Sequence, residues 1–592
     1  MLERLSKMDL LELKKIIKDS DEINMLEKYI PKMSAYSFMF ECNKSRMEKY
    51  ALNYLGRKYT YTELRGKTDI CAKAFAEKGI IPGDDVAIVS LSTPEAIIAF
   101  YAFVKIGARV HLINGTHDKQ SIKEDLKECN AKMLVINDVF CDDEMRKVTD
   151  ELSIKDIVMT SLDDTFPIGF FLDDVKFKLI KLIKSFSNGM KNNDKCISWR
   201  KLEKIGRSSN KVVEPYYEEN AGVVVASTSG STGKAKKPLM SNEALNAMAF
   251  EMGMSCDAFA PNDSILTTLP IWIFYSLFNS IHVPLCLGVT VDLDPLFNST
   301  KIHNRLKQYK FNHWNTVPSY VEDLVADKKV KNMDLSFLKS ITTGGDYRTP
   351  KLKMESEQKL NNNNSFIEVG QGYGASECGG CFGYSYEENM APETVGKPLI
   401  GNKYKIIEID TGKELGPNEV GEIYLYSATM MLEYFNDPEA TKKSLITDKN
   451  GIKWYKTEDM GHFDDKGQLF IDGRIRRIEL TRDENGSPAK VFPDRIKQVI
   501  SKHPDIEQCE VIMVPDKKKT TVPVAFIVPK NENQELTSNM IKTINSLCVS
   551  ENLESYSIPV EYRLIKSIPK TASLKTDYKK LAEEYEVAHV KK

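Results

Sequence analysis

The segment 227–237 reads Ser-Thr-Ser-Gly-Ser-Thr-Gly-Lys-Ala-Lys-Lys, and its residue types suit it to hold phosphate. An apolar run from Ala221 to Ala226 precedes it and predicts a buried strand, so the polar residues form the turn that leaves this strand. Glycines let the backbone approach a ligand, and N–H groups, hydroxyls and a lysine can then surround phosphate oxygens. We therefore predict a loop for the polyphosphate of a nucleotide. The alternative is a solvated Ser/Gly turn that binds nothing.

This segment does not match the Walker P-loop, Gly-x4-Gly-Lys-Ser/Thr. The residue five positions before Gly233 is Thr228, where that motif requires glycine. Lys234 is followed by Ala235, which has no hydroxyl group for magnesium. A P-loop NTPase is therefore excluded.

A second polar cluster, Gln-Gly-Tyr-Gly-Ala-Ser-Glu, occupies residues 371–377. Tyr373 stands between two glycines, so a flat base can stack on its ring. Ser376 can bond phosphate, and Glu377 can hold a magnesium ion that bridges phosphate oxygens. A Gly-x-Ser-x-Gly nucleophile elbow is excluded, because position 378 is cysteine where glycine is required.

Two further clusters lie nearer the C-terminus. Residues 455–459 read Tyr-Lys-Thr-Glu-Asp, and Asp459 can accept both hydroxyls of a ribose, although a turn or N-cap aspartate has the same appearance. Arg474 follows after a Gly-containing hairpin. Residues 569–577 read Pro-Lys-Thr-Ala-Ser-Leu-Lys-Thr-Asp, and Lys575 on a mobile small domain could enter a site for phosphoryl transfer. By itself that last segment is only a polar loop.

The four clusters, in this order, resemble the acyl-adenylating (ANL) superfamily of acyl-CoA synthetases, luciferases and peptide-synthetase adenylation domains. The resemblance covers residues 50–580 and includes Gly421-Glu422-Ile423 as a further match. It implies a phosphate loop, an adenine and magnesium segment, a ribose aspartate, a hinge arginine and a catalytic lysine. The residues that match these positions are Thr228, Ser229, Gly230, Ser231, Thr232, Gly233 and Lys236; Gly372, Tyr373, Gly374, Ser376 and Glu377; Asp459; Arg474; and Lys575.

The resemblance implies a two-step reaction. A carboxylate attacks the α-phosphate of Mg-ATP, which gives an acyl-adenylate and pyrophosphate, and a thiol then takes the acyl group. Lys236, Glu377 and Lys575 are the implied catalytic residues, Glu377 as the magnesium ligand and Lys575 as the bridge between the carboxylate and the α-phosphate. The family also implies that the small domain rotates about the hinge between steps and withdraws Lys575.

Several positions depart from the family pattern. Ala235 replaces a proline, while Lys237 and Glu458 replace glycines. The hinge residues Arg476 and Arg477 are basic where an acidic residue is usual, and Leu574 replaces the glycine before the catalytic lysine. Residues 481–490 are predicted to form an inserted loop in the region that shapes the thiol tunnel. The thiol is predicted to be coenzyme A, with a carrier-protein phosphopantetheine, or release of the adenylate itself, as alternatives. A nucleotide-binding protein that has lost catalysis is the third hypothesis.

The acid is predicted from the stretch 270–277, Pro-Ile-Trp-Ile-Phe-Tyr-Ser-Leu. It lacks the aspartate that pairs with the α-ammonium of amino-acid substrates, and a buried ammonium without a counter-charge is costly. Trp272, Phe274 and Tyr275 favour an apolar or aryl pocket, with plain core packing as the alternative for each. The family places Gly344 and Gly345 in the same pocket.

These segments need a scaffold, and the alternation of strands and helices predicts one of α/β class. We expect a large N-terminal domain of mixed sheets flanked by helices (1–472) and a small mobile α+β domain (473–592). Within the first, we expect a helical appendage over 1–45 and an irregular insertion over 140–215. The insertion includes a basic amphipathic helix at 172–186. This helix is predicted to bind a membrane surface or a partner, with packing on its own domain as the alternative.

Composition narrows the function classes. The 592 residues carry 82 basic and 84 acidic side chains, so no global field attracts nucleic acid, and none is expected as a partner. The start of the chain lacks a signal-peptide pattern, and the longest apolar stretch, 265–289, is interrupted by prolines, an asparagine and a histidine, so no membrane span is expected. The 11 cysteines, including Cys378 and Cys381, are expected to be reduced thiols of a cytoplasmic protein.

Overall fold

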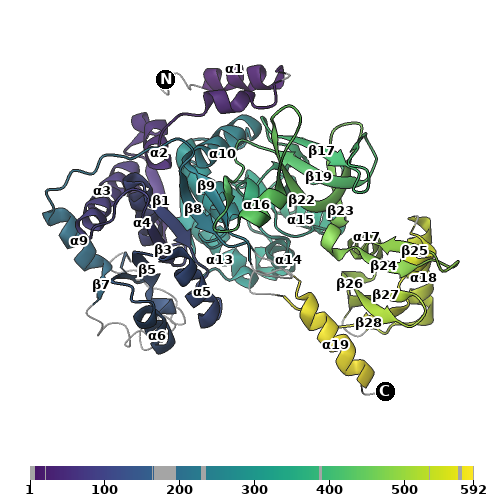
Figure 1. Ribbon diagram of the computed structural model, residues 1–592. Helices are drawn as coiled ribbons and strands as arrows, with labels where there is room; N and C mark the ends of the chain where they lie inside the picture. Colours follow the sequence, from purple (N-terminus) through teal and green to yellow (C-terminus); the bar gives the residue numbers. More distant parts are fainter. Residues whose placement is uncertain are drawn as a thin grey trace.

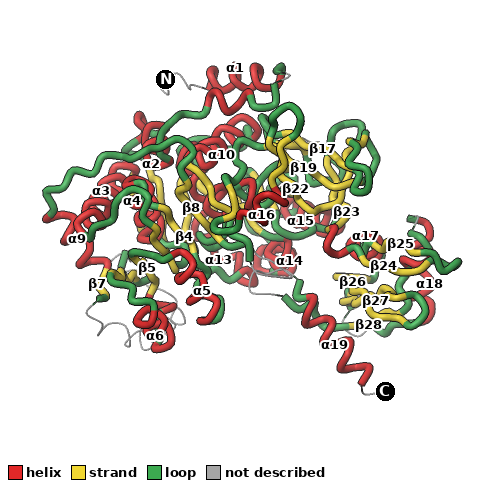
Figure 2. Tube along the Cα trace, viewed as in Figure 1, coloured by secondary structure: helices red, strands yellow, loops and turns green. Residues whose placement is uncertain are grey.

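The computed structural model describes residues 7–20, 22–162, 164–165, 195–228, 235–385, 390–531, 534–551, 553–570 and 576–590. A large body of sheets and helices holds most of the chain, and a smaller α+β unit lies beside it and carries the C-terminus (Figures 1 and 2). The predicted fold class, mixed α/β with a small C-terminal domain, is confirmed.

An eight-stranded sheet forms the first half of the large body, in the order β20-β9-β8-β4-β3-β5-β6-β7. Its central strands are parallel and are buried on both faces, which explains continuous apolar runs such as Gly-Val-Val-Val-Ala in β8. The strands are β3 (Asp85–Val89), β4 (Arg109–Leu112), β5 (Met133–Asn137), β6 (Asp156–Thr160), β7 (Cys196–Ser198), β8 (Gly222–Ala226), β9 (Pro238–Ser241) and β20 (Glu433–Tyr434).

A nine-stranded sheet forms the second half, in the order β16-β15-β14-β13-β12-β10-β11-β1-β2. Strands β12, β13 and β14 are parallel neighbours, so their carboxyl ends bring Gly344 and Tyr373 to the same edge. The strands are β1 (Tyr50–Tyr54), β2 (Arg57–Thr60), β10 (Ser264–Thr267), β11 (Thr290–Leu293), β12 (His313–Thr316), β13 (Ser340–Thr343), β14 (Val369–Tyr373), β15 (Gly383–Tyr384) and β16 (Lys397–Pro398).

The helices that cover these sheets begin at residues whose side chains cap them. Thr60 and Glu63 form a capping box on α3 (Tyr61–Glu77). Thr93 caps α4 (Pro94–Ile106), which starts with proline and ends at Gly107 with φ +89°. The other helices of the large body are α1 (Lys7–Lys18), α2 (Ala35–Cys42), α5 (Lys119–Cys129), α6 (Asp143–Glu151), α9 (Trp199–Ser208), α10 (Asn242–Ser255), α11 (Phe274–Ser276), α12 (Val283–Leu287), α13 (Ile302–Tyr309), α14 (Pro318–Ala326), α15 (Pro350–Asn361) and α16 (Pro438–Ser444).

Two expectations about the large domain are wrong. The predicted appendage over 1–45 includes α2, but α2 is buried in the main core, where Phe38 stacks on Phe250 of α10 at 5.7 Å. The predicted irregular insertion over 140–215 contains β6 and β7, which extend the eight-stranded sheet, and α9, which packs on α3. Residues 166–194, with the predicted basic helix 172–186, lie outside the described residues.

The apolar stretch 265–289 forms a strand followed by helical segments. It contains β10, α11, a π-helical turn (Leu277–His282) and α12, and leads into β11. In the part of the chain that the structure describes, no helix combines the length and the apolar character that crossing a membrane requires. All eleven cysteines are free thiols, as predicted.

A third sheet connects the large body to the small domain. Its order is β18-β17-β19-β22-β21, with β23 paired to β22. The predicted boundary at 472–474 lies in the last residues of β23, and a 3-10 turn (Ile475–Arg477) follows. The strands of this third sheet are β17 (Lys403–Ile407), β18 (Glu414–Leu415), β19 (Gly421–Tyr426), β21 (Leu445–Thr447), β22 (Lys453–Phe463) and β23 (Leu469–Arg474).

The small domain places a hairpin and a three-stranded sheet against three helices (Figure 1). Its elements are β24 (Glu479–Arg482), β25 (Pro488–Val491), α17 (Pro493–Ile500), β26 (Ile506–Asp516), β27 (Thr520–Pro529), α18 (Ser538–Ser550), β28 (Glu561–Leu564) and α19 (Tyr578–Val590). Charged contacts join it to the large body, among them Lys351 with Glu507 at 2.6 Å. Lys570 lies 3.8 Å from Asp346, which follows Gly344 and Gly345. The segment before Lys575 therefore contacts the edge at which β13 ends.

Candidate active site

The predicted phosphate loop leaves β8 and returns as β9. The Thr228 N–H donates to the Lys236 carbonyl at 2.8 Å, which closes the loop at its base. Ser229, Gly230, Ser231, Thr232 and Gly233 lie outside the described residues. The Lys236 ammonium lies 4.8 Å from the centroid of the Tyr434 ring and donates to the Ser444 hydroxyl at 3.4 Å.

Lys237, which replaces a family glycine, has a structural role. Its ammonium is buried and pairs with Asp125 at 2.5 Å and Glu128 at 3.0 Å, both on α5. Burial alone lowers the pKa of Lys237, but the two carboxylates outweigh it and raise the pKa above its ordinary value. This substitution therefore ties the end of the phosphate loop to a helix and leaves Lys236 as the lysine that faces Tyr434.

Glu377 lies on a short 3-10 turn (Ser376–Cys378) directly after β14. Its carboxylate is buried and accepts a 2.7 Å hydrogen bond from the Tyr434 hydroxyl. Tyr434 therefore contacts both Glu377, which follows β14 of the nine-stranded sheet, and Lys236, which precedes β9 of the eight-stranded sheet. In the described residues, no three His, Cys, Asp or Glu side chains gather in a cluster that could hold a metal ion. One carboxylate fits magnesium in an ATP site, since this ion is usually bound by one or two carboxylates together with substrate phosphates.

Asp459 connects the predicted adenine segment to the hinge. Tyr373 donates its hydroxyl to Asp459 at 2.8 Å, and Arg474 lies 3.0 Å from the other oxygen of Asp459. Burial and the adjacent Asp459 carboxylate hold the pKa of Tyr373 well above its usual value, so its hydroxyl remains a donor. The Asp459 carboxylate raises the pKa of Arg474 further. Three predicted site residues from β14, β22 and β23 thus meet at one point.

Glu458 keeps the backbone conformation that its family glycine suggests. Its φ is +59°, in the left-handed region that disfavours side chains. The Glu458 carboxylate lies 2.5 Å from the Arg476 guanidinium in the hinge turn. The glutamate and the unusual basic hinge residue therefore compensate for each other in charge.

Arg477, the second basic hinge residue, belongs to the small domain. It donates to the Tyr578 hydroxyl at 2.6 Å and to the Val511 carbonyl at 2.8 Å, and it pairs with Asp494. The predicted inserted loop 481–490 forms most of the β24–β25 hairpin instead. Lys575 lies outside the described residues, but Lys570 and Thr576 on its two sides form a β-bridge.

The predicted acid-pocket residues separate into two groups. The Tyr275 ring lies beside Gly344, where an added Cβ would meet it at 3.5 Å, and its hydroxyl approaches the Thr342 carbonyl at 3.4 Å. Trp272 and Phe274 are buried and pack against Phe140 and Phe278. Gly345 has φ +81° and open space around its Cα.

Gly374 shows why a glycine follows Tyr373. A Cβ there would lie 2.6 Å from the Gly380 carbonyl oxygen and 2.7 Å from the Cys381 Cα. Gly380 has φ +83°, and a Cβ added there would lie 2.6 Å from the Tyr275 backbone. These close backbone contacts hold the adenine segment against the start of the predicted acid pocket. Gly372 is less constrained, because a Cβ added there would have its nearest neighbour at 3.6 Å.

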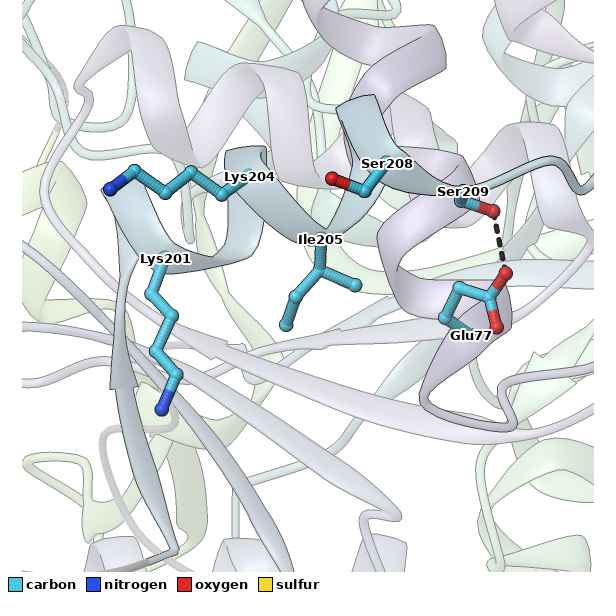
Figure 3. A pocket seen from close by; sticks show the side chains of 6 residues that line it. All are labelled: Glu77, Lys201, Lys204, Ile205, Ser208 and Ser209. Atoms are coloured by element: carbon cyan, nitrogen blue, oxygen red, sulfur yellow. Dashed lines mark hydrogen bonds between the residues drawn. The ribbon is translucent and has the colours of Figure 1, made fainter.

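A surface hollow of about 410 Å³ lies elsewhere, between α3 and α9, and Figure 3 shows the residues that line it. Lys201 and Lys204 extend from α9 on one side, and the Ser209 hydroxyl donates to Glu77 at 2.6 Å on the other. None of the predicted site residues lines this hollow, so we assign it no part in the chemistry.

Comparison with known proteins decides the family. The sequence pattern described as "AMP-binding enzyme" matches residues 39–435, and "AMP-binding enzyme C-terminal domain" matches residues 495–575. The chain belongs to the AMP-binding enzyme family. The predicted membership of the acyl-adenylating superfamily, and with it an ATP-dependent, AMP-forming ligase, is confirmed.

Relatives of this enzyme match it over most of its length. An indoleacetate–CoA ligase of Aromatoleum aromaticum is 25% identical over 527 residues, 88% of this chain and 92% of the relative. A 4-coumarate–CoA ligase of Vanilla planifolia is 25% identical over 560 residues, 92% of each. Among solved structures, ATP-bound MatB from Rhodopseudomonas palustris has a TM-score of 0.77 at 19% identity, covering 93% of this chain and 99% of that one. This structural likeness shows the fold.

Two residues that contact the predicted site were not among the predicted site residues. Tyr434 is one, and the signal that could have found it is an aromatic residue just before the Asp437-Pro438 start of α16. Lys237 is the other. The sequence shows that Lys237 departs from the family pattern, but it does not show the carboxylates on α5 with which Lys237 pairs. Both depend on contacts between segments far apart in sequence.

Proposed function

We propose that this enzyme activates an aryl or otherwise apolar carboxylic acid with ATP and transfers the acyl group to coenzyme A. The observation that carries the proposal is the meeting of Tyr373, Asp459 and Arg474, which joins the predicted adenine segment to the ribose aspartate and the hinge. The relatives named above act on indoleacetate and 4-coumarate, and the coenzyme A and aryl-acid assignments follow that pattern.

In this proposal each cluster binds one part of ATP. Tyr373 provides a face for adenine, and Asp459 accepts the ribose hydroxyls while Arg474 holds its carboxylate in place. The segment 228–236 surrounds the β- and γ-phosphates, with Lys236 as the fixed positive charge and Ser376 as a further donor. Lys236 already contacts Tyr434 and Ser444 in the structure, so its charge can stabilise the departing pyrophosphate without reorganising.

Magnesium fits this site through Glu377. When bound, the ion would neutralise phosphate charge and polarise the phosphorus–oxygen bonds. Glu377 is suited to the task because it is buried and one of its oxygens is bonded to Tyr434. Lys236, on the other side of Tyr434 just before β9, supplies a second positive charge.

The acid is proposed to lie beside Tyr275 and the two glycines after β13. A Cβ added to Gly344 would lie 3.5 Å from the Tyr275 ring, so the glycine leaves the ring uncovered. A Cβ added to Gly345 would have no neighbour within 4 Å. An aromatic ring can stack or contact Tyr275 there. Lys575 is proposed to bridge the acid carboxylate and the α-phosphate in the first step. The charged contact between Lys570 and Asp346 supports a first-step orientation of the small domain.

A pyrophosphate-release assay tests this function. A panel of aryl, alkyl and amino acids is supplied with ATP and magnesium, with and without coenzyme A, and acyl-CoA is identified by mass. We expect release with aryl acids, stimulation by coenzyme A, and loss of acid-dependent ATP–pyrophosphate exchange in Lys575→Ala. ATP binding without exchange on any acid would contradict the proposal and favour a non-catalytic nucleotide-binding protein.

A further inference from the structure

Tyr434 stands between the two charged residues that are proposed to hold the phosphates and the metal. It is fully buried, with 1% of its surface exposed. Its hydroxyl donates to Glu377 at 2.7 Å, and its ring faces the Lys236 ammonium at 4.8 Å. The two contacts use different parts of one side chain, so the hydroxyl contact can be removed while the ring contact is kept.

The backbone around Tyr434 is fixed from both sides. Tyr434 pairs with Pro238 of β9, and the Phe435 N–H donates to the Lys237 carbonyl at 2.7 Å, one residue from Lys236. The Met431 N–H donates to the Glu377 carbonyl at 2.7 Å. The Tyr434 N–H itself donates to the Thr441 hydroxyl at 2.9 Å. The segment 431–435 thus connects β9 of one sheet with the turn after β14 of the other.

We propose that Tyr434 is a positioning residue that sets the Glu377 carboxylate for magnesium and, through its ring, sets Lys236 for the phosphates. The inference rests on the proposed function, because it takes Glu377 as the metal ligand. A carboxylate on a turn has several accessible orientations, and a hydrogen bond from a rigid buried donor selects one of them.

Binding of ATP in the absence of acid tests the proposal without turnover. Affinity is measured by calorimetry in buffer with EDTA and in buffer with excess magnesium, and the ratio of the two is the magnesium-dependent gain. Tyr434→Phe removes only the hydroxyl group. We expect its EDTA affinity to equal that of the wild type and its magnesium-dependent gain to fall by about tenfold, the worth of one hydrogen bond to a charged group. Tyr434→Leu also removes the ring and should weaken binding in EDTA.

The chain offers a matched control. Tyr426 is also buried and donates its hydroxyl to a glutamate, Glu27, at 2.7 Å. Tyr426→Phe loses a hydrogen bond of the same kind away from Glu377, so it should keep the full magnesium-dependent gain. Thermal unfolding of both phenylalanine variants shows whether their folds are equally intact.

Glu377→Gln separates this inference from the function on which it rests. If Glu377→Gln loses the gain and Tyr434→Phe keeps it, Tyr434 does not position the carboxylate and the inference is wrong, while the metal role of Glu377 stands. If Glu377→Gln keeps the gain, the metal role of Glu377 is wrong and the inference is overturned with it. Equal losses in Tyr434→Phe and Tyr426→Phe would also overturn it.

Discussion

Glu251 is a buried carboxyl group on α10, and replacing it with glutamine tests how it affects stability. It has no exposed surface. It accepts hydrogen bonds from Asn402 at 3.1 Å and from Ser427 at 3.2 Å. The Ser427 and Thr429 hydroxyls are 2.6 Å apart, and Thr429 donates to the Cys378 carbonyl at 3.1 Å. The carboxyl group therefore supports the turn that carries Glu377 indirectly, through Ser427 and Thr429.

Burial raises the pKa of Glu251 from its ordinary 4.5 to about 8, and the hydrogen bonds from Asn402 and Ser427 offset only part of this. Because the folded state keeps a proton that the unfolded chain releases above pH 4.5, folding loses stability as pH rises from 4.5 to 8. With these values the group costs about 2 kcal/mol at pH 6 and about 5 kcal/mol at pH 9. Glutamine does not titrate, so the free energy of unfolding of Glu251→Gln relative to the wild type should increase by about 3 kcal/mol from pH 6 to pH 9.

Urea unfolding of the wild type and Glu251→Gln, followed by tryptophan fluorescence at half-unit steps from pH 6 to pH 9, measures this difference. The two stabilities should diverge with rising pH and become parallel above pH 8. Glu414→Gln, at an exposed position, should follow the wild type throughout. A difference between wild type and Glu251→Gln that is constant with pH would refute the reasoning, because it would show that the buried group does not change its protonation state in this range.

Three further changes test individual contacts. Asp459→Asn removes the charge that Arg474 and Tyr373 contact. A hydrogen bond to a charged group contributes about 1.5–3 kcal/mol, so the KM for ATP in the exchange assay should rise by about 10- to 100-fold. An unchanged KM would count against a ribose-binding role for Asp459. Glu458→Gly relieves the strain of a positive φ but loses an exposed ion pair, so its urea midpoint should stay near that of the wild type. Glu458→Ala loses the ion pair and keeps the strain, so it should be about 1 kcal/mol less stable than the glycine variant. Gly374→Ala forces a Cβ to within 2.6 Å of a carbonyl oxygen and should abolish exchange, while Gly66→Ala, with open space on α3, should keep activity and raise the melting temperature.

The reaction class and the general architecture could be predicted from the sequence because they depend on residues that lie close together along the chain. Caps such as Thr93-Pro94 act within one helical turn, and the apolar run 222–226 is buried wherever its sheet forms. The four polar clusters carry recognisable spacing, because the residues proposed to bind each part of ATP are neighbours in the sequence. Residues such as Tyr373, Glu377 and Asp459 could therefore be named before their arrangement was known.

Only the tertiary structure decided which of these residues touch and which side chains support them. The sequence places Tyr434 and Glu377 57 positions apart, and no local rule connects them. Lys237 departed from the family pattern, and its two carboxylate partners on α5 explain the departure. Helix α2 resembled a surface appendage because its apolar residues find their partners about 200 positions later, on α10. Short-range propensity is encoded along the chain, whereas burial, ion pairing and the pKa of a buried group arise from segments that meet only after the chain has folded.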